Sequence, residues 1–454
     1  MLPAALAEDI SHKAHQADEI AGVLLCSVVH AASRDIRLLG REMIWLEPSA
    51  YDKKGPYGLV LNAEGYTRPL AVADSLNATP IWVHTHPGLG ASPNPSEHDV
   101  IVDQGIADVF RLRSGSPYYG ALIFSPRANG LAFTGHLDVA ERAINLDRLW
   151  IVGSRLQLST AYGSKNALNA AAFDRNIRAF GGDLQHALSE LHVGIVGTGG
   201  TGSAVAEQLV RLGVRRLMLV DPDFLSASNV TRVYGSTPLD VGRPKVEVVA
   251  DHLLRIAPDI QCERVISTIN TERSAKQLTA CDIIFGCTDD NAGRLILSRI
   301  PTYLLTPVID CGVLLSSEDD RLTGIDGRVT SLIPGDACLL CHNRIDLARA
   351  AAELLTPEER SRREDEGYAP ALGRQEPAVV AFTTMVAATA VSELLERFIG
   401  YGPEPRPNEV LLRCHEREIS TNIASPREGH YCNAASRKMG IGSSDPFLGL
   451  TWPT

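Results

Sequence analysis

The sequence lacks an excess of positive charge, a long hydrophobic run and any repeated or low-complexity tract. Its 43 lysine and arginine residues are outnumbered by 54 aspartate and glutamate residues, giving a formal net charge of −11. A general nucleic-acid binder needs a basic face for phosphates, so we expect no nucleic-acid partner. The longest apolar run, residues 378–391, is too short to span a bilayer and lies between Glu376 and Glu393. We therefore predict a buried helix there and no membrane association.

The chain also has no apolar secretion signal at its start and no disulfide-rich composition. Its nine cysteines are an odd number spread over 454 residues, which favours buried thiols and a metal site in a reducing compartment. The opening residues, MLPAALAEDISHK, carry acids where a signal peptide would be apolar. We therefore expect a cytoplasmic protein without a signal peptide, long enough for two or three domains.

The first half has the mixed pattern of an α/β domain, which we predict over residues 1–155. An amphipathic helix at about Pro3 to Asp18 opens it. Strand-like segments are expected at residues 20–29, 79–86, 119–125 and 131–137, with a helix at 96–113. Small and polar residues over 156–170 predict a linker.

From residue 171 to 424 the pattern changes to an alternation of strands and helices. Strands are expected at residues 192–197, 215–221, 281–287 and 306–312, with helices beginning at Thr201 and Pro244. Such alternation is typical of a Rossmann-like, doubly wound α/β sheet with helices on both faces. Within this domain the charged run 357–377 predicts a mobile loop, and residues 425–454 are expected to form a C-terminal tail.

The segment HTHPGLGASPNPSEHD holds four residues with the spacing of a metal site: His84, His86, Ser96 and Asp99. Residues two apart on a strand face the same side, so both imidazoles can reach one ion. Ser96 is a natural helix N-cap, and Asp99 lies one turn into that helix on the same side. Two histidines and one carboxylate leave the fourth position of Zn²⁺ to water, as in hydrolytic zinc sites. A lone histidine pair is more often structural, so the added serine and aspartate carry the prediction.

These residues resemble the signature of the JAB/MPN-type zinc metalloproteases, H-x-H-P followed by S-x-x-D. That family also has an upstream E-x-x-G-[LV]-x-L motif, which the segment from Glu19 to Leu25 matches. The resemblance implies hydrolysis of peptide or isopeptide bonds after the C-terminal glycine of a ubiquitin-like protein. It implies a catalytic Zn²⁺ on His84, His86 and Asp99, with Glu19 as general base and Ser96 as a further catalytic residue.

A second constellation lies in HVGIVGTGGTGS, where glycines follow a predicted strand and precede a helix. Glycines let the backbone approach a phosphate, and the helix N-terminus supplies amide donors. The residues are Gly197, Gly199, Gly200 and Gly202, with Asp221 ending the next strand, where it can accept ribose hydroxyls. This pattern alone describes an NAD-binding dehydrogenase equally well.

The motifs FDRNI, DPDFLSASNVTR, GRPK and CTDDNAGR add polar residues to the glycine-rich loop. Together they resemble the ThiF-type adenylyltransferases that activate ubiquitin-like and sulfur-carrier proteins, over about residues 170–424. In that reaction a C-terminal carboxylate attacks the α-phosphate of ATP, so two anions must meet and cations are needed. The resemblance implies ribose binding by Asp221, triphosphate binding by Asn229, Arg232 and Lys245, Mg²⁺ coordination by Asp289, and an arginine, Arg175, supplied across a homodimer interface. A dehydrogenase would need no such set.

The sequence PGDACLLCHN contains Cys338 and Cys341 in a C-x-x-C pair. Many relatives of the ThiF type combine it with a second C-x-x-C to bind a structural Zn²⁺. Near the end of this chain stands only Cys432, with His430 two residues before it and Cys414 further back. We predict a second, structural Zn²⁺ on Cys338, Cys341 and Cys432 and leave its fourth ligand open. The remaining cysteines are expected to be buried thiols: Cys26, Cys262, Cys281, Cys287 and Cys311.

The sequence therefore predicts a bifunctional enzyme that adenylates the C-terminal glycine of a β-grasp modifier and hydrolyses bonds after that glycine. The alternatives are a sulfur-carrier pathway for cofactor or amino-acid biosynthesis, and a non-enzymatic scaffold that binds the modifier. No cysteine lies between Cys341 and Cys414, so the segment after the C-x-x-C pair offers no thiolate that could carry the activated tail as a thioester. We therefore expect the activated tail to pass to a cysteine of a partner such as a conjugating enzyme.

Overall fold

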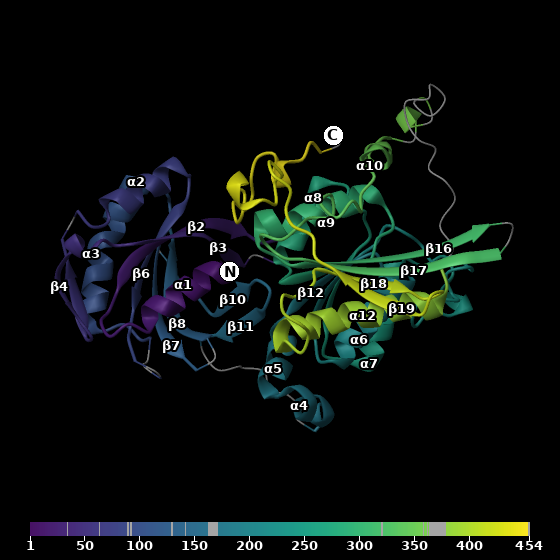
Figure 1. The fold of residues 1–454 in the computed structure, drawn as a ribbon, viewed down its shortest axis with the longest axis horizontal. Coiled ribbons are helices and arrows are strands. Elements are labelled where there is room, and N and C mark those ends of the chain that lie inside the picture. Colours follow the sequence, from purple (N-terminus) through teal and green to yellow (C-terminus); the bar gives the residue numbers. More distant parts are fainter. Residues whose placement is uncertain are drawn as a thin grey trace. The chain divides into compact units, whose positions relative to one another are not determined.

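The structure is a computed structural model that describes residues 1–454 except 34, 63, 89, 91–92, 129, 141, 162–170, 319–320, 357, 361, 363–377 and 453–454. The chain divides into two units, drawn in Figure 1 as a ribbon. The first unit consists of Met1–Val29, Ile36–Lys165 and Gly440–Gly442, and the second of His30–Asp35, Asn166–Met439 and Ser443–Thr454. Three residues of the predicted tail therefore group with the first unit.

The first unit is built on a six-stranded sheet with the order β3-β2-β6-β7-β8-β9. Its strands are β2 (Ala21–His30), β3 (Ile36–Trp45), β6 (Thr79–Thr85), β7 (Tyr119–Arg127), β8 (Gly130–Val139) and β9 (Arg142–Asn145). The helices are α1 (Ala4–Ala14), α2 (Thr67–Ser75) and α3 (Glu97–Ser114). Strands β6 and β7 pair in parallel, with α3 as their crossover, whereas β2 and β6 pair antiparallel. Shorter strands form a hairpin of β4 (Tyr51–Gly55) and β5 (Gly58–Leu61), and a sheet of β1 (Leu2–Pro3), β10 (Arg148–Val152) and β11 (Leu156–Thr160).

Alternating side chains give the six-stranded sheet an apolar core on each face. Ile81 and Val83 of β6 are fully buried in a cluster that includes residues of α1. Trp82, between them, packs in the other cluster with Phe110 of α3 and residues of α2. Because the side-chain period of a strand is two, the residue after Val83 must lie on the α3 face. This alternation places His84 on the same face as Trp82.

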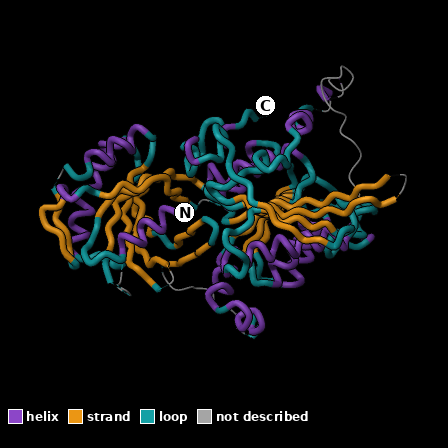
Figure 2. Tube along the Cα trace, in the orientation of Figure 1, coloured by secondary structure: helices purple, strands orange, loops and turns teal. Residues whose placement is uncertain are grey.

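The second unit contains an eight-stranded sheet with the order β14-β13-β12-β15-β16-β17-β18-β19. The strands are β12 (His192–Val196), β13 (Arg216–Val220), β14 (Gln261–Val265), β15 (Ile283–Gly286), β16 (Val308–Glu318), β17 (Arg321–Leu332), β18 (Glu409–Arg413) and β19 (Glu418–Asn422). The five strands from β14 to β16 are parallel neighbours, and pairing turns antiparallel from β16 onward. In Figure 2, β16 and β17 extend past the helices of this unit.

Helices cover both faces of that sheet, as the strand–helix alternation predicts (Figure 1). One face carries α6 (Gly200–Arg211), α7 (Lys245–Ile256) and α12 (Val380–Ile399), and the other carries α8 (Glu272–Gln277) and α9 (Asn291–Leu304). Further helices are α4 (Asp174–Phe180), α5 (Gly182–Glu190) and α10 (Leu347–Glu353). Helix α12 contains the apolar run 378–391 from Val380 onward and packs beside α6. Among the described residues, no helix combines the length and the apolar character that crossing a bilayer requires.

Two local predictions are corrected by the structure. The opening helix ends at Ala14, four residues earlier than expected. The predicted linker, 156–170, begins with a strand, because Leu156 is buried and residues 156–160 pair with β10 in an antiparallel register. The remainder of that linker, 162–170, lies outside the described residues, as does the charged run 357–377 apart from residues 358–360 and 362.

The contact between the start of α6 and the end of β12 gives a first testable prediction. A Cβ atom at Gly202 would lie 1.8 Å from the carbonyl oxygen of Gly197, which is far inside van der Waals contact. We expect Gly202→Ala to lower the free energy of unfolding by about 3 kcal/mol, because the backbone must shift to admit the methyl group. Urea denaturation measures this change. Gly182→Ala is the matched control, because nothing lies within 4 Å of its added Cβ; an equal loss in both variants would contradict the prediction.

Candidate functional site

A cavity of about 700 Å³ lies in the second unit, at the carboxyl ends of the parallel strands. Strand β12 stands between β13 and β15. The chain passes from β12 through α6 to β13 on one side, and it reaches β15 on the other side only after α8. In doubly wound sheets this reversal of strand order opens a crevice at the carboxyl edge, which is where ligands bind. The cavity is therefore in the position where a nucleotide binds in such folds.

The glycine-rich loop brings the backbone to the floor of this cavity. Gly197 has φ of +89°, and a Cβ there would lie 2.6 Å from the carbonyl oxygen of Cys287. Gly199 is the N-cap of α6, and Gly200 is its first residue. All three glycines line the cavity. The free amide groups of the first turn of α6 therefore face the cavity, where the helix dipole favours an anion.

Asp221 follows β13 directly and is 5% exposed. Its Oδ2 accepts hydrogen bonds from the backbone N–H of Thr198 at 2.6 Å and from the Thr198 hydroxyl at 3.1 Å, and its Oδ1 accepts from the N–H of Asp223. Burial raises the pKa of Asp221, although nearby Lys245 opposes the shift. The side chain thus ties the glycine-rich loop to the end of β13 and also lines the cavity.

Four basic side chains from different elements line the same cavity: Arg232, Lys245, Arg294 and Arg360. Lys245 Nζ lies 2.7 Å from Asp223 Oδ2, and Arg294 Nε lies 3.7 Å from the fully buried carboxylate of Asp310. The sequence interpretation named the first two and missed the last two. Arg294 is the last residue of the CTDDNAGR motif, so the sequence offered a signal for it. Arg360 lies in the charged run 357–377, which was interpreted as a mobile loop.

Two neighbouring aspartates, Asp289 and Asp290, differ in how many hydrogen bonds their carboxylates accept within the protein. Asp290 caps α9, where it accepts from the N–H of Gly293 at 2.7 Å, and it also accepts from Asn270 and from the Thr288 hydroxyl. Asp289 is exposed and lines the cavity. Carboxylate oxygens are the ligands that Mg²⁺ prefers beside phosphates. Asp289 can therefore offer an oxygen to Mg²⁺ without breaking a helix cap.

Three residues that the sequence assigned to nucleotide binding do not line the cavity. Gly202 lies within α6, against Gly197. Asn229 is buried, and its Oδ1 accepts from the N–H of Ser226 at 3.3 Å, which holds the turn before Arg232. Arg175 lies exposed on α4, a helix without a buried residue.

In the first unit, three side chains converge at the end of β6. Nε2 of His84 lies 3.3 Å from Nε2 of His86 and 3.3 Å from Oδ1 of Asp99, and Nε2 of His86 lies 3.6 Å from Oδ2 of Asp99. A tetrahedral Zn²⁺ with ligands at about 2.05 Å keeps nitrogen and oxygen donors about 3.3 Å apart. The three ligand atoms thus have the spacing of three corners of a zinc tetrahedron.

Glu19 and Ser96 border these three side chains. Glu19 directly precedes Ile20, whose N–H donates to the Thr85 hydroxyl and whose carbonyl accepts from the N–H of Thr85. Glu19 therefore stands beside His86. Burial is the main cause that raises the pKa of Glu19, against the opposing effect of both histidines. The Ser96 hydroxyl donates to Asp99 Oδ2 at 2.8 Å and accepts from the N–H of Asp99, which completes a capping box at the start of α3.

A second group of ligand atoms lies in the second unit and includes Cys338, Cys341, His430 and Cys432. The Sγ atom of Cys341 lies 3.7 Å from the Sγ atom of Cys338 and 3.6 Å from the Sγ atom of Cys432. His430 Nδ1 lies 3.3 Å, 3.6 Å and 3.4 Å from the three sulfurs in sequence order. A tetrahedral Zn²⁺ with sulfur ligands at about 2.3 Å requires spacings of about 3.5–3.8 Å. His430 thus supplies the fourth candidate ligand atom of this group, whereas Cys414 lies beside Met385.

The hydrogen bond from Cys432 is the largest cause that lowers the pKa of Cys338, to about 4, with further contributions from Tyr431 and His430. A thiolate in this group suits a bound cation. The remaining cysteines are partly as predicted: Cys26, Cys281 and Cys311 are buried, whereas Cys262 and Cys287 are partly exposed.

Comparisons with known proteins address the second unit. Molybdopterin-synthase adenylyltransferase from Escherichia coli is 38% identical over 171 residues, which are 37% of this chain and 65% of that protein. Ubiquitin-like modifier-activating enzyme 5 from Arabidopsis thaliana is 29% identical over 176 residues, 35% of this chain and 39% of that protein. SAMP-activating enzyme E1 from Haloferax volcanii is 27% identical over 180 residues, 38% of this chain and 63% of that protein. The chain thus spans less than two thirds of the length of each relative.

The sequence profile of the ThiF family matches residues 173–434, which is more than half of the chain. The matched region holds the glycine-rich loop, the basic side chains and the cysteine–histidine group described above. The predicted resemblance of the second half is confirmed, and the chain belongs to the ThiF family.

Proposed function

We propose that the second unit adenylates the C-terminal carboxylate of a ubiquitin-like or sulfur-carrier protein with ATP. The observation that carries the proposal is one cavity lined by the glycine-rich loop, by four cations and by Asp289. The relatives named above support the substrate class, since their names describe activation of such proteins. In the reaction the carboxylate attacks the α-phosphate and pyrophosphate leaves, so Arg232, Lys245 and Arg294 neutralise the charge that gathers. Mg²⁺ on Asp289 would supply further neutralisation when bound.

Arg175 fits the proposal as a residue supplied by a second copy of the chain. It lies exposed on α4 and does not line the cavity of its own unit. A homodimer in which α4 packs on the partner would bring another cation to the triphosphate. After adenylation, transfer to a conjugating enzyme's cysteine would mean protein modification, whereas transfer to a sulfur donor would mean biosynthesis. Weighing the products with each type of acceptor separates these two pathways.

Substitutions in the cavity test the adenylation proposal. We expect Asp289→Asn and Lys245→Ala to slow ATP–pyrophosphate exchange at least about 100-fold, because each removes a charge that acts on the phosphates in the transition state. Exchange is measured with a β-grasp protein that ends in glycine.

Asp259→Asn and Lys276→Ala are matched controls on the surface of the same unit, where the two side chains are 71% and 53% exposed. Both controls should keep full exchange activity. Undiminished exchange in Asp289→Asn would contradict the role of that carboxylate.

The specific geometry of the first unit supports a second activity, zinc-dependent hydrolysis after the terminal glycine of the same modifier. We propose that His84, His86 and Asp99 hold Zn²⁺ in a JAB/MPN-type site and leave one position open. Zn²⁺ in such a site lowers the pKa of a bound water towards neutrality. Glu19, beside His86, is placed to take the proton and deliver it to the leaving amine. Ser96 fixes Asp99 and lies within reach of the same site.

His86→Ala and Glu19→Gln test the hydrolase. We expect both to abolish cleavage of a modifier extended beyond its terminal glycine while ATP–pyrophosphate exchange continues, because these residues belong to the first unit. Glu8→Gln, an exposed change on α1, should cleave normally. Cleavage that persists in Glu19→Gln would rule out this general base.

We further propose that Cys338, Cys341, His430 and Cys432 hold a structural Zn²⁺. Metal analysis should give two zinc ions per chain in the wild type and one in either Cys338→Ser or His86→Ala. Cys338→Ser should also lower thermal stability, because the metal joins the C-x-x-C segment to residues about 90 positions later. Cys262→Ser removes a thiol outside the group and should retain both ions. Two ions in Cys338→Ser would refute this assignment.

A further inference from the structure

A cavity of about 330 Å³ lies between α3 and strands β6, β7 and β8 of the first unit. Its floor is apolar, since it includes Trp82 and Ile123, which are 3% and 5% exposed, together with Ala121. His84 and Asp99 line one part of it, so the cavity adjoins the proposed zinc site. The ThiF profile, which matches residues 173–434, does not reach this part of the chain.

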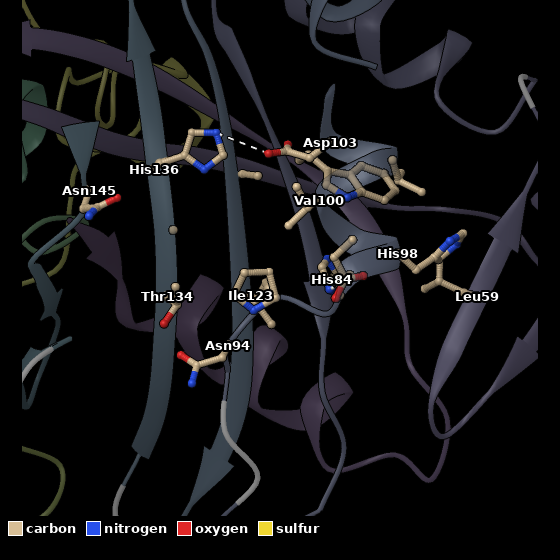
Figure 3. A pocket seen from close by; sticks show the side chains of 16 residues that line it. Leu59, His84, Asn94, His98, Val100, Asp103, Ile123, Thr134, His136 and Asn145 are labelled. Atoms are coloured by element: carbon tan, nitrogen blue, oxygen red, sulfur yellow. Dashed lines mark ion pairs between the residues drawn. The ribbon is translucent and has the colours of Figure 1, made fainter. Parts of the chain in front are cut away.

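The other part of the cavity is polar and carries an excess of negative charge. Nε2 of His136 lies 3.4 Å from Asp103 Oδ2 and 3.6 Å from Asp138 Oδ1. Figure 3 shows His136 of β8 facing Asp103 of α3, with His84 further along the cavity. Arg111 pairs with Asp138 at 2.9 Å, whereas Asp103 is faced by His136 and by the neutral hydroxyl of Tyr119.

Asp103 would gain from a cation in the cavity. Burial is the main cause that raises the pKa of this carboxyl group, which means that its charged form is incompletely compensated by the groups around it. The side chains of Asp103 and His136 are each 24% exposed, so both remain reachable from the cavity. A positively charged group beside Asp103 would form a charge-assisted hydrogen bond there.

His84 lines the same cavity and is incompletely hydrogen-bonded. The residue is 5% exposed, and its Nδ1 atom has no hydrogen-bond partner within the described part of the chain. A histidine that binds metal through Nε2 normally donates its other N–H to an oxygen. Among the described residues, no oxygen is placed to accept from this Nδ1 atom.

We propose that this cavity binds a substrate side chain with an apolar stem and a positively charged end, close to the bond that the zinc site cleaves. The stem would lie on Trp82, Ala121 and Ile123, and the charged end would meet Asp103. Long basic side chains combine these two properties, because their methylene groups pack on apolar surfaces while the head group stays polar. The inference deepens the proposed hydrolase function and rests on it for the identity of the bound molecule as substrate.

Binding of small probes tests the cavity without any hydrolysis. The probes are n-butylguanidinium, its neutral counterpart pentanamide and the anion butyrate, each titrated into the full-length protein and followed by saturation-transfer NMR. We expect n-butylguanidinium to bind about tenfold more tightly than pentanamide, and butyrate to bind least, because the charged hydrogen bond to Asp103 forms with the first probe alone.

Two variants locate the binding. Asp103→Asn keeps the size of the side chain. It should weaken the binding of n-butylguanidinium about tenfold, so that its affinity equals that of pentanamide. Ala121→Leu should fill the space above the floor of the cavity and weaken the binding of both probes. Asp74→Asn removes the same charge from an exposed position on α2 and should bind like the wild type. Thermal melting and zinc content establish that each variant is folded.

Equal binding of all three probes, or unchanged affinity in Asp103→Asn, would overturn the inference. Selective probe binding without any cleavage of modifier fusions would leave the cavity assignment standing and remove the hydrolase proposal. Cleavage without selective probe binding would leave the hydrolase proposal standing and remove the cavity assignment. The two proposals can therefore fail separately.

Discussion

The close contact between Gly202 and the carbonyl of Gly197 is the constraint on which the nucleotide cavity depends. It lets α6 begin directly at the end of β12, so the free amides of the helix face the carboxyl edge of the sheet. The register of β12 with β13 and β15 then brings Asp221 and the loop after Gly286 to the same edge. A bulkier residue at position 202 would move the helix away and separate groups that come from four different loops.

Electrostatics explains how the cavity keeps several cations close together without a bound anion. Lys245 is 8% exposed and is paired with Asp223, and Arg294 is held near the fully buried Asp310, which also binds Arg328 at 2.7 Å. Burial lowers the pKa of Arg328, so the Asp310 carboxylate offsets a real desolvation cost. Protein carboxylates thus orient Lys245 and Arg294, so a polyanion in the cavity would need little rearrangement of these two side chains.

Local spacing made much of the fold and the ligand sets predictable, and contacts distant in sequence account for most of what was missed. The two-residue step from His84 to His86 and the turn from Ser96 to Asp99 follow from strand and helix periods alone. The choice of His430 depends on a contact across about 90 residues, and Arg360 lines the cavity beside residues that are far from it in sequence. Likewise, β17, β18 and β19 extend the sheet antiparallel beyond the strand–helix alternation that the sequence displays.

The two groups of metal-ligating side chains differ in the number of positions that a tetrahedral ion would have left. The cysteine–histidine group offers four ligand atoms and has three buried members, so an ion there would have no place for water and would act by joining distant segments. The histidine–aspartate group offers three ligand atoms and opens onto a cavity that contains His136 and Asp103. An ion there would keep a free position facing space for a substrate. Ligand number and access therefore distinguish the proposed structural role of one group from the proposed hydrolytic role of the other, although both groups have tetrahedral spacing.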